Sequence, residues 1–150
     1  MARNHFTAAN SAAVALVAAT AKTALQLKSG TNLITALQMI EVTFDGVVNN
    51  AIPVKIDLLR QTTAGTMTGL TPNKIKDTST SLQVTAQENA TVEPTAGALL
   101  HTWYIHPQAG VIHELTLPDG EIELPSAGFV GLRLTAPAAV NTLATIRGEE

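Results

Sequence analysis

Apolar and polar residues alternate along much of this chain, which is the two-residue period of a β-strand. The stretch 37–44, LQMIEVTF, places Ile40, Val42 and Phe44 on one face. The polar residues between them lie on the other face, and the Asp-Gly pair at 45–46 favours a turn. The pattern therefore predicts a strand that ends in a turn.

Downstream of this turn the alternation continues, but two stretches rich in turn-forming residues interrupt it. Residues 53–61 alternate and are predicted to form a strand that pairs back on 37–44 as a hairpin. Residues 62–79 contain glycine, proline and threonine without any period, so a long loop is predicted there. A short strand at 80–86 follows, and 87–97 is predicted to be a second connection.

The last third of the chain again favours strands. Residues 99–106, LLHTWYIH, have the β-branched and aromatic content of a central strand, and a turn at 107–110 leads into a strand at 111–117. Gly131 is predicted to mark a bulge or a close approach of two backbones. Further strands are predicted at 121–124, 129–136 and 139–147.

The N-terminal stretch 10–27 is rich in alanine, so helix propensity and strand period disagree there. Its apolar run, 12–19, is too short to cross a bilayer, and no transmembrane helix is predicted. This run and the small residues at 19–21 resemble a secretion signal, although we expect the segment to be retained. Because the rest of the chain favours strands, 6–18 is predicted to be extended and 22–28 to be a strand, with a short helix as the alternative.

Apolar side chains without any nearby charge distinguish the first 19 residues, since no Lys, Arg, Asp or Glu lies between Arg3 and Lys22. An N-terminus is poorly ordered unless something holds it, and strand addition to a neighbour would do so. We therefore predict that residues 1–19 form an arm that contacts another subunit, or else a first strand of the chain's own sheet. The predicted contact residues are Phe6, Val14, Leu16 and Val17.

Together these patterns predict an all-β protein with about eight to ten short strands and an extended N-terminal arm. The expected architecture is a sandwich or barrel of the jelly-roll kind. With 150 residues the chain is long enough to bury a core of its own. Residues 20–150 are predicted to be a single domain.

Charged residues make up only 14% of the chain, against roughly a quarter in an average soluble domain. The net charge is -3 and no run of lysine or arginine occurs, so nucleic acid is not an expected partner. The chain has no cysteine, which excludes disulfides and thiolate metal sites. The composition fits either a neutral, secreted kind of β domain or a subunit whose outer faces are covered by neighbours in an assembly.

Three histidines in the C-terminal half are the best candidates for a metal site, because imidazole is a common metal ligand. His101 and His106 are an odd number of residues apart and should face opposite sides of one strand. Across the predicted hairpin, His113 should lie nearer Tyr104 than His106. We therefore expect structural histidines and no bound metal or other cofactor.

The remaining candidate chemistry also favours a structural role. Glu114, Asp119, Glu121 and Glu123 could pair as general acid and base, but near a Pro-Asp-Gly turn they are expected to be a solvated hairpin tip. No nucleophile motif or phosphate-binding glycine loop is present, so no enzymatic activity is expected. Trp103 and Tyr104 could stack on a sugar, although core filling is the expected use of so few aromatic residues.

Four stretches carry a resemblance to a known family: PVKIDLLRQTTAGTMTGLTPNKI, TAQENATVEPTAG, WYIHPQ and GLRLTAPAAVN. In this order they resemble small proteins encoded among the head genes of tailed bacteriophages, the capsid decoration or cement proteins. The resemblance spans residues 12–150.

This resemblance implies a β-rich virion subunit, commonly a homotrimer, that sits on the capsid exterior and bridges major capsid subunits. It also implies no enzymatic activity, no cofactor, and neither nucleic acid nor membrane as a partner. Two other functions stay open on the sequence: a carbohydrate-binding β-sandwich module, or another virion position such as a tail or head-fibre component.

Overall fold

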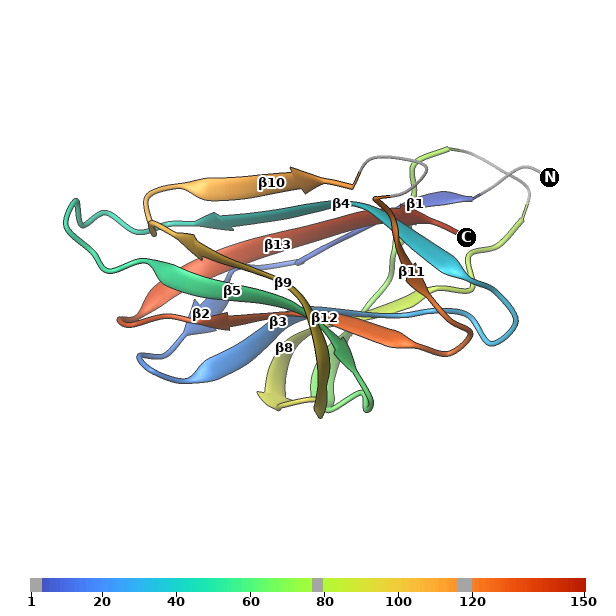
Figure 1. Ribbon diagram of the computed structural model, residues 1–150, viewed down its shortest axis with the longest axis horizontal. Helices are drawn as coiled ribbons and strands as arrows, with labels where there is room; N and C mark the ends of the chain where they lie inside the picture. Colours follow the sequence, from blue (N-terminus) through green and yellow to red (C-terminus); the bar gives the residue numbers. More distant parts are fainter. Residues whose placement is uncertain (1–3, 77–79, 116–119) are drawn as a thin grey trace.

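The computed structural model describes residues 4–76, 80–115 and 120–150, and every regular element in these ranges is a β-strand (Figure 1). The strands form two antiparallel sheets that pack face to face as a sandwich. The prediction of an all-β sandwich is therefore confirmed. The described residues hold thirteen strands rather than eight to ten, because several short edge strands lack a clear alternation.

The first sheet has seven strands, and the long strands β4 and β13 lie at its centre. The C-terminal strand β13 pairs with β4 on one side and with the N-terminal strands β1 and β2 on the other. The main path runs β10 (Gly110–Glu114), β4 (Thr35–Phe44), β13 (Val140–Glu149), β1 (His5–Ala9) and β7 (Asn73–Lys74), while β11 (Ile122–Leu124) pairs with β4 and β2 (Val14–Leu16) with β13.

The second sheet has six strands, and its centre is formed by β3 and β12. The order is β6 (Thr66–Leu70), β8 (Thr85–Val92), β3 (Ala21–Lys28), β12 (Phe129–Thr135), β5 (Val54–Gln61) and β9 (Ala96–Ile105). The register of β12 on β3 shifts next to Leu132, which confirms the irregularity predicted near Gly131.

Alternating apolar residues of both sheets fill the space between them. In β5, for example, Val54, Ile56 and Leu58 point inward and are fully buried, as predicted from the sequence. The same holds for Ile40 and Val42 of β4. The largest fully buried side chains include Phe6, Leu16, Leu25, Leu27, Leu37, Leu124, Leu132 and Leu134.

The N-terminal segment belongs to the chain's own sheet, so of the two predicted alternatives the first strand is observed and the arm that reaches a neighbour is not. Strand β1 pairs along its whole length with β13, from His5 opposite Glu149 to Ala9 opposite Thr145. Strand β2 pairs with the start of β13. Phe6, Val14 and Leu16, which were predicted to contact a neighbour, are buried in the core instead. Their strands pair with β13, which lies at the other end of the sequence.

The hairpin predicted between 37–44 and 53–61 does not form, because β4 and β5 lie in different sheets. The connection 45–53 crosses from one sheet to the other at one end of the sandwich (Figure 1). Alternation shows which face of a strand is buried, and both sheets bury one face against the same core. It therefore does not identify the strand's partner.

The predicted loop 62–79 contains the edge strands β6 and β7, and part of it, residues 77–79, lies outside the described residues. The strand expected at 80–86 starts only at Thr85 and continues through the stretch that was predicted to be a connection. These strands are rich in threonine, glycine and asparagine, so they show little contrast between their two faces. Val84, just before β8, is nevertheless buried.

Strand β9 lies at the edge of its sheet instead of the predicted central position, and it pairs only with β5. After the turn at residues 107–108 the chain enters β10, which belongs to the other sheet. Strands β9 and β10 thus form a corner between the sheets, and they are not paired as a hairpin. One side of the sandwich consequently carries an edge strand of each sheet (Figure 1).

Candidate functional site

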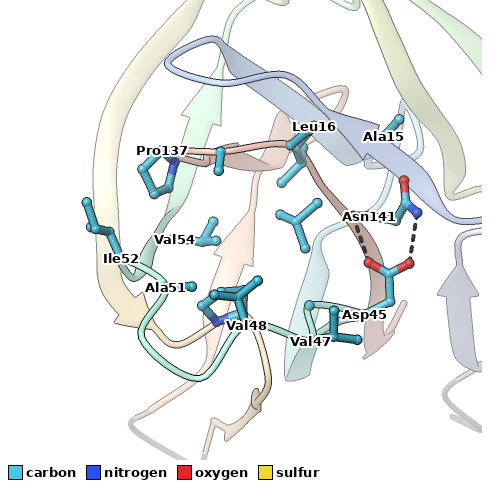
Figure 2. Close-up of a pocket in the computed structure, with 15 residues that line it drawn as sticks. Ala15, Leu16, Asp45, Val47, Val48, Ala51, Ile52, Val54, Pro137 and Asn141 are labelled. Atoms are coloured by element: carbon cyan, nitrogen blue, oxygen red, sulfur yellow. Dashed lines mark hydrogen bonds between the residues drawn. The ribbon is translucent and has the colours of Figure 1, made fainter.

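A hollow of about 490 Å³ opens at the end of the sandwich where the connection 45–53 crosses between the sheets (Figure 2). This connection forms one wall, and the turn between β12 and β13, at 137–139, forms another. The buried side chains of Leu16 and Val54 belong to the lining. We refer to this surface, comprising residues 45–52 and 137–141 with the side chains beneath them, as the apolar end.

Aliphatic side chains at the apolar end are unusually exposed. Val47 is 84% exposed, Ile52 69% and Val48 55%. Alanine and proline make up half of the other lining residues, and no lysine, arginine or glutamate lines the hollow. A contiguous patch of exposed apolar side chains on a folded domain is typical of a binding surface.

Hydrogen bonds at its base hold the connection 45–53 in place. The carboxylate of Asp45 accepts hydrogen bonds from the side-chain amide of Asn141 at 2.8 Å and from the backbone N–H of Asn141 at 2.9 Å. These bonds hold the pKa of Asp45 below its usual range. The exposed aliphatic side chains therefore project from a loop with a defined base (Figure 2).

A close backbone contact fixes the loop on its second side. The N–H of Gly46 donates to the carbonyl of Pro107 at 2.9 Å, and a Cβ atom at position 46 would lie only 2.6 Å from that oxygen. The side chain of Gln108 donates to Asn49 at 2.9 Å. Glycine is required at position 46 because the two backbones approach so closely.

The apolar end has the chemistry of a contact surface. Its single carboxylate, on Asp45, is already occupied by Asn141, and the remaining lining groups are aliphatic. Covering an exposed valine or isoleucine with apolar atoms contributes about 1.5–3 kcal/mol per side chain. Such a lining suits an uncharged, apolar ligand.

Of the four predicted contact residues, three are buried in the chain's own core, which corrects that prediction. Phe6, Val14 and Leu16 are at most 2% exposed, and Leu16 contributes to the floor of the apolar end from inside. Val17 is exposed. The sequence signal that was missed is the run VVNNAI at 47–52, which places apolar residues within a connection between strands.

Two of the three candidate histidines, His101 and His113, form an aromatic cluster with Trp103. The rings of His101 and Trp103 on β9 lie 4.1 Å apart, and the ring of His113 on β10 lies 5.0 Å and 5.3 Å from them. This places His113 beside His101, not beside Tyr104 as predicted, because β9 and β10 lie in different sheets. Within residues 4–76, 80–115 and 120–150, no group of three or more metal-ligating side chains is placed to hold an ion.

Trp103 packs against the core and contacts the rings of His101 and His113. This agrees with the expected role in core filling. Tyr104 points away from the core and is 68% exposed. A sugar-binding face usually needs aromatic planes and polar groups that converge on one hollow. The described residues do not bring Tyr104 and Trp103 together in this way.

The acidic candidates lie apart from the apolar end. Glu114 is exposed on β10, and Asp119 lies outside the described residues. Glu121 and Glu123 line a smaller hollow of about 220 Å³ together with Glu149 and Glu150. The carboxylate of Glu150 is engaged there in a structural contact, since it accepts hydrogen bonds from two consecutive backbone N–H groups, at 83 and 84.

Comparison with known proteins found no match of this chain to a family model, to a curated protein or to a solved structure. In the part of the chain that the structure describes, no helix has the length and apolar character needed to span a membrane.

Proposed function

We propose that this chain is a structural virion protein that decorates and stabilises the outside of a tailed-phage capsid. It binds the major capsid protein through its apolar end and bridges neighbouring subunits of the shell. In this role it works without a catalytic centre or a cofactor. The proposal has two parts, and each rests on its own support.

The binding part rests on one observation, the exposed aliphatic side chains of the apolar end. Val47, Val48 and Ile52 project from a connection that is fixed at its base by Asp45 and Gly46. A surface whose backbone is already ordered loses little conformational freedom on binding. Asp45 is the one charged side chain in its lining and is already hydrogen-bonded to Asn141, so few ions need to be desolvated when a partner covers this surface.

The phage part rests on the sequence resemblance of residues 12–150 to capsid decoration proteins. An all-β sandwich with a charge-poor surface suits a subunit that is covered by neighbours. Other virion positions, such as a tail or head fibre, would use the same apolar end on a different partner. We favour the capsid because the resemblance is to head proteins.

Co-sedimentation with capsid shells tests the proposal. Shells assembled from the major capsid protein of the same genome are mixed with the chain and pelleted. We expect the wild-type chain to pellet with the shells, and the variant Ile52→Asp to remain in the supernatant, because it places an unpaired charge in the contact.

The variant Val92→Asp is the matched control, since Val92 is an apolar residue on β8 that is 60% exposed, close to the 69% of Ile52. It should pellet like the wild type. If the wild-type chain stays in the supernatant, the proposed function is wrong. If Ile52→Asp and the wild type pellet equally, binding does not use the apolar end.

A further inference from the structure

The outer edge of β9 is a long strand edge that carries neither charge nor proline, and its register irregularities are confined to the first half of the strand. Strand β9 ends the second sheet, and no strand in the described ranges pairs with its outer side (Figure 1). Its ten residues, Ala96–Ile105, include no lysine, arginine, aspartate, glutamate or proline. Natural proteins normally place charges, proline or bulges on such edges to prevent other chains from adding to them.

The regular part of β9 is the part that a further strand could use. The register with β5 shifts around Leu59, opposite the first half of β9, but runs without interruption from His101 to Ile105. This second half also carries Tyr104, the most exposed side chain of the strand among its large apolar residues. An added strand would extend the sheet and cover the phenol ring.

The hydrogen bonds of Thr102 show which backbone N–H and C=O groups of β9 point away from β5. The N–H of Thr102 donates to the imidazole Nδ1 of its own neighbour His101 at 2.9 Å, and its hydroxyl donates at 2.8 Å to Asp57, which lies directly opposite on β5. Side chains approach this closely in antiparallel pairs that exchange no backbone hydrogen bonds. Along a strand, alternate residues direct their N–H groups to the same side. Thr102 and Tyr104 therefore direct their N–H and C=O groups to the open side of the sheet, where the N–H of Thr102 is already bound to His101 and the N–H of Tyr104 is the donor that an added strand would meet.

We propose that this edge is a self-association site, at which β9 of a second copy of the chain adds antiparallel across a twofold axis. A strand that pairs antiparallel with itself meets the same residues in reverse order. Because β9 has no charged side chain, no like charges face each other in this arrangement. A twofold contact is also self-limiting, since each copy uses the same edge once.

We favour pairing of β9 with β9 of a second copy over pairing of β9 with β6, the other edge strand of the same sheet. Strand β6 has only five residues, and its register with β8 shifts between Thr66 and Thr68. It therefore offers a shorter and less regular template than β9. A pairing of β9 with β6 of another copy would continue from copy to copy, whereas pairing of β9 with itself closes.

This inference does not depend on the proposed function, because it concerns the isolated chain. It also differs from the trimer that the resemblance implies, since a twofold contact joins two copies. The two tests can therefore fail separately: shell binding tests the apolar end, and the mass of the free protein tests β9.

Replacement of Tyr104 by proline tests the hydrogen bonds of the edge. Proline removes an N–H that points away from β5, so the strand should keep its place in the sheet. Tyr104→Thr is the matched control, because it removes the same ring but keeps the N–H. Sedimentation equilibrium should show two-chain species for the wild type and Tyr104→Thr, with association about tenfold or more weaker for Tyr104→Pro.

Cysteine crosslinking gives a second readout, because the chain has no cysteine of its own. Tyr104→Cys should form a two-chain product with a short thiol crosslinker, while Val92→Cys, exposed on β8, should not. A monomeric wild type at high micromolar concentration, a trimer that crosslinks at Val92→Cys instead, or equal association of the proline and threonine variants would overturn the proposal.

Discussion

At the residue scale, Gly131 shows how a single missing side chain organises a polar layer on the outer face of the second sheet. Gln26 on β3 donates to Gln61 on β5 at 2.6 Å, and Gln61 donates to Thr23 at 3.1 Å. Strand β12 lies between β3 and β5, so these side chains meet directly above Gly131. A Cβ atom at this position would lie 2.3 Å from Oε1 of Gln61.

Gly131→Ala should therefore destabilise the protein, because the added methyl group displaces Gln61 and breaks its two hydrogen bonds. The expected loss is about 1–3 kcal/mol in the free energy of unfolding, measured by urea denaturation. In a Gln61→Ala background the same change should cost clearly less, since nothing remains to be displaced. An equal loss in both backgrounds would show that Gln61 is not the cause.

Glu88 is the second residue whose role becomes visible only in the folded chain. It is 5% exposed, and one carboxylate oxygen accepts hydrogen bonds from the N–H of Ser11 at 2.8 Å and from the side chain of Asn10 at 3.0 Å. Burial raises its pKa, but the hydrogen bonds from Ser11 and Asn10 outweigh this and lower the pKa overall. The carboxylate thus joins the turn after β1 to β8.

The pH dependence of stability should reveal this carboxylate. A lowered pKa in the folded state means that its contribution is fully present above the pKa of the unfolded chain and is lost as pH falls through the folded value. Glu88→Gln should lose about 1–3 kcal/mol at neutral pH, and the difference from the wild type should shrink toward about pH 3. Glu114→Gln, exposed on β10, should differ little from the wild type throughout.

At the scale of elements, side chains of β9 and β10 cover the side of the sandwich on which these two edge strands lie. His101 and Trp103 on β9 contact His113 on β10, so the two sheets are joined there by rings. Burial, and then the nearby charge of protonated His101, lower the pKa of His113. Protonation of this cluster at acid pH therefore opposes the contact between the two edge strands.

The stability of the protein should fall in mild acid because of this cluster. His113 with a lowered pKa contributes stability that is complete above the unfolded value, about 6.5, and that decreases as pH falls below it. Thermal unfolding of the wild type should show a lower midpoint at about pH 5 than at pH 7.5. His113→Phe, which keeps a ring against Trp103, should reduce this drop, and an unchanged drop would contradict the role of His113.

The sequence was sufficient to predict the strands whose two faces differ in polarity. It was not sufficient to predict which strands pair with one another. Strands β3, β4, β5 and β12 alternate clearly, and they were predicted close to their observed bounds. Strand β6 was missed because its residues, TMTGL, are exposed on an edge and need no alternation. The sheet to which β5 belongs depends on how 45–53 crosses the core, and no local pattern in the strand encodes this.

The apolar end could have been suspected from the sequence but not located. Valine and isoleucine in the connection 45–53 are unusual between two strands, but the Asp-Gly pair that precedes them predicts only a turn. The other walls come from the turns at 107 and 137–141, which only the fold brings alongside. The opposite error occurred at Phe6 and Val14, whose apolar character indicates core filling and not a contact.

At the scale of the whole molecule, the low fraction of charged residues and the lining of the apolar end both predict that binding depends little on salt. No lysine, arginine or glutamate lines this surface, and the carboxylate of Asp45 is occupied by Asn141. Binding to the shell should therefore change little between about 0.05 and 0.5 M salt, because screening acts only on charges. A steep loss of co-sedimentation with salt would indicate a charged contact elsewhere on the surface.

A reconstruction by electron cryo-microscopy of shells saturated with the chain tests the central claim most directly. The account predicts density for the sandwich on the outside of the shell, with the end that carries Val47, Val48 and Ile52 against the major capsid protein. Shells without added density on their outside, or a bound chain whose residues 45–52 face solvent, would contradict it.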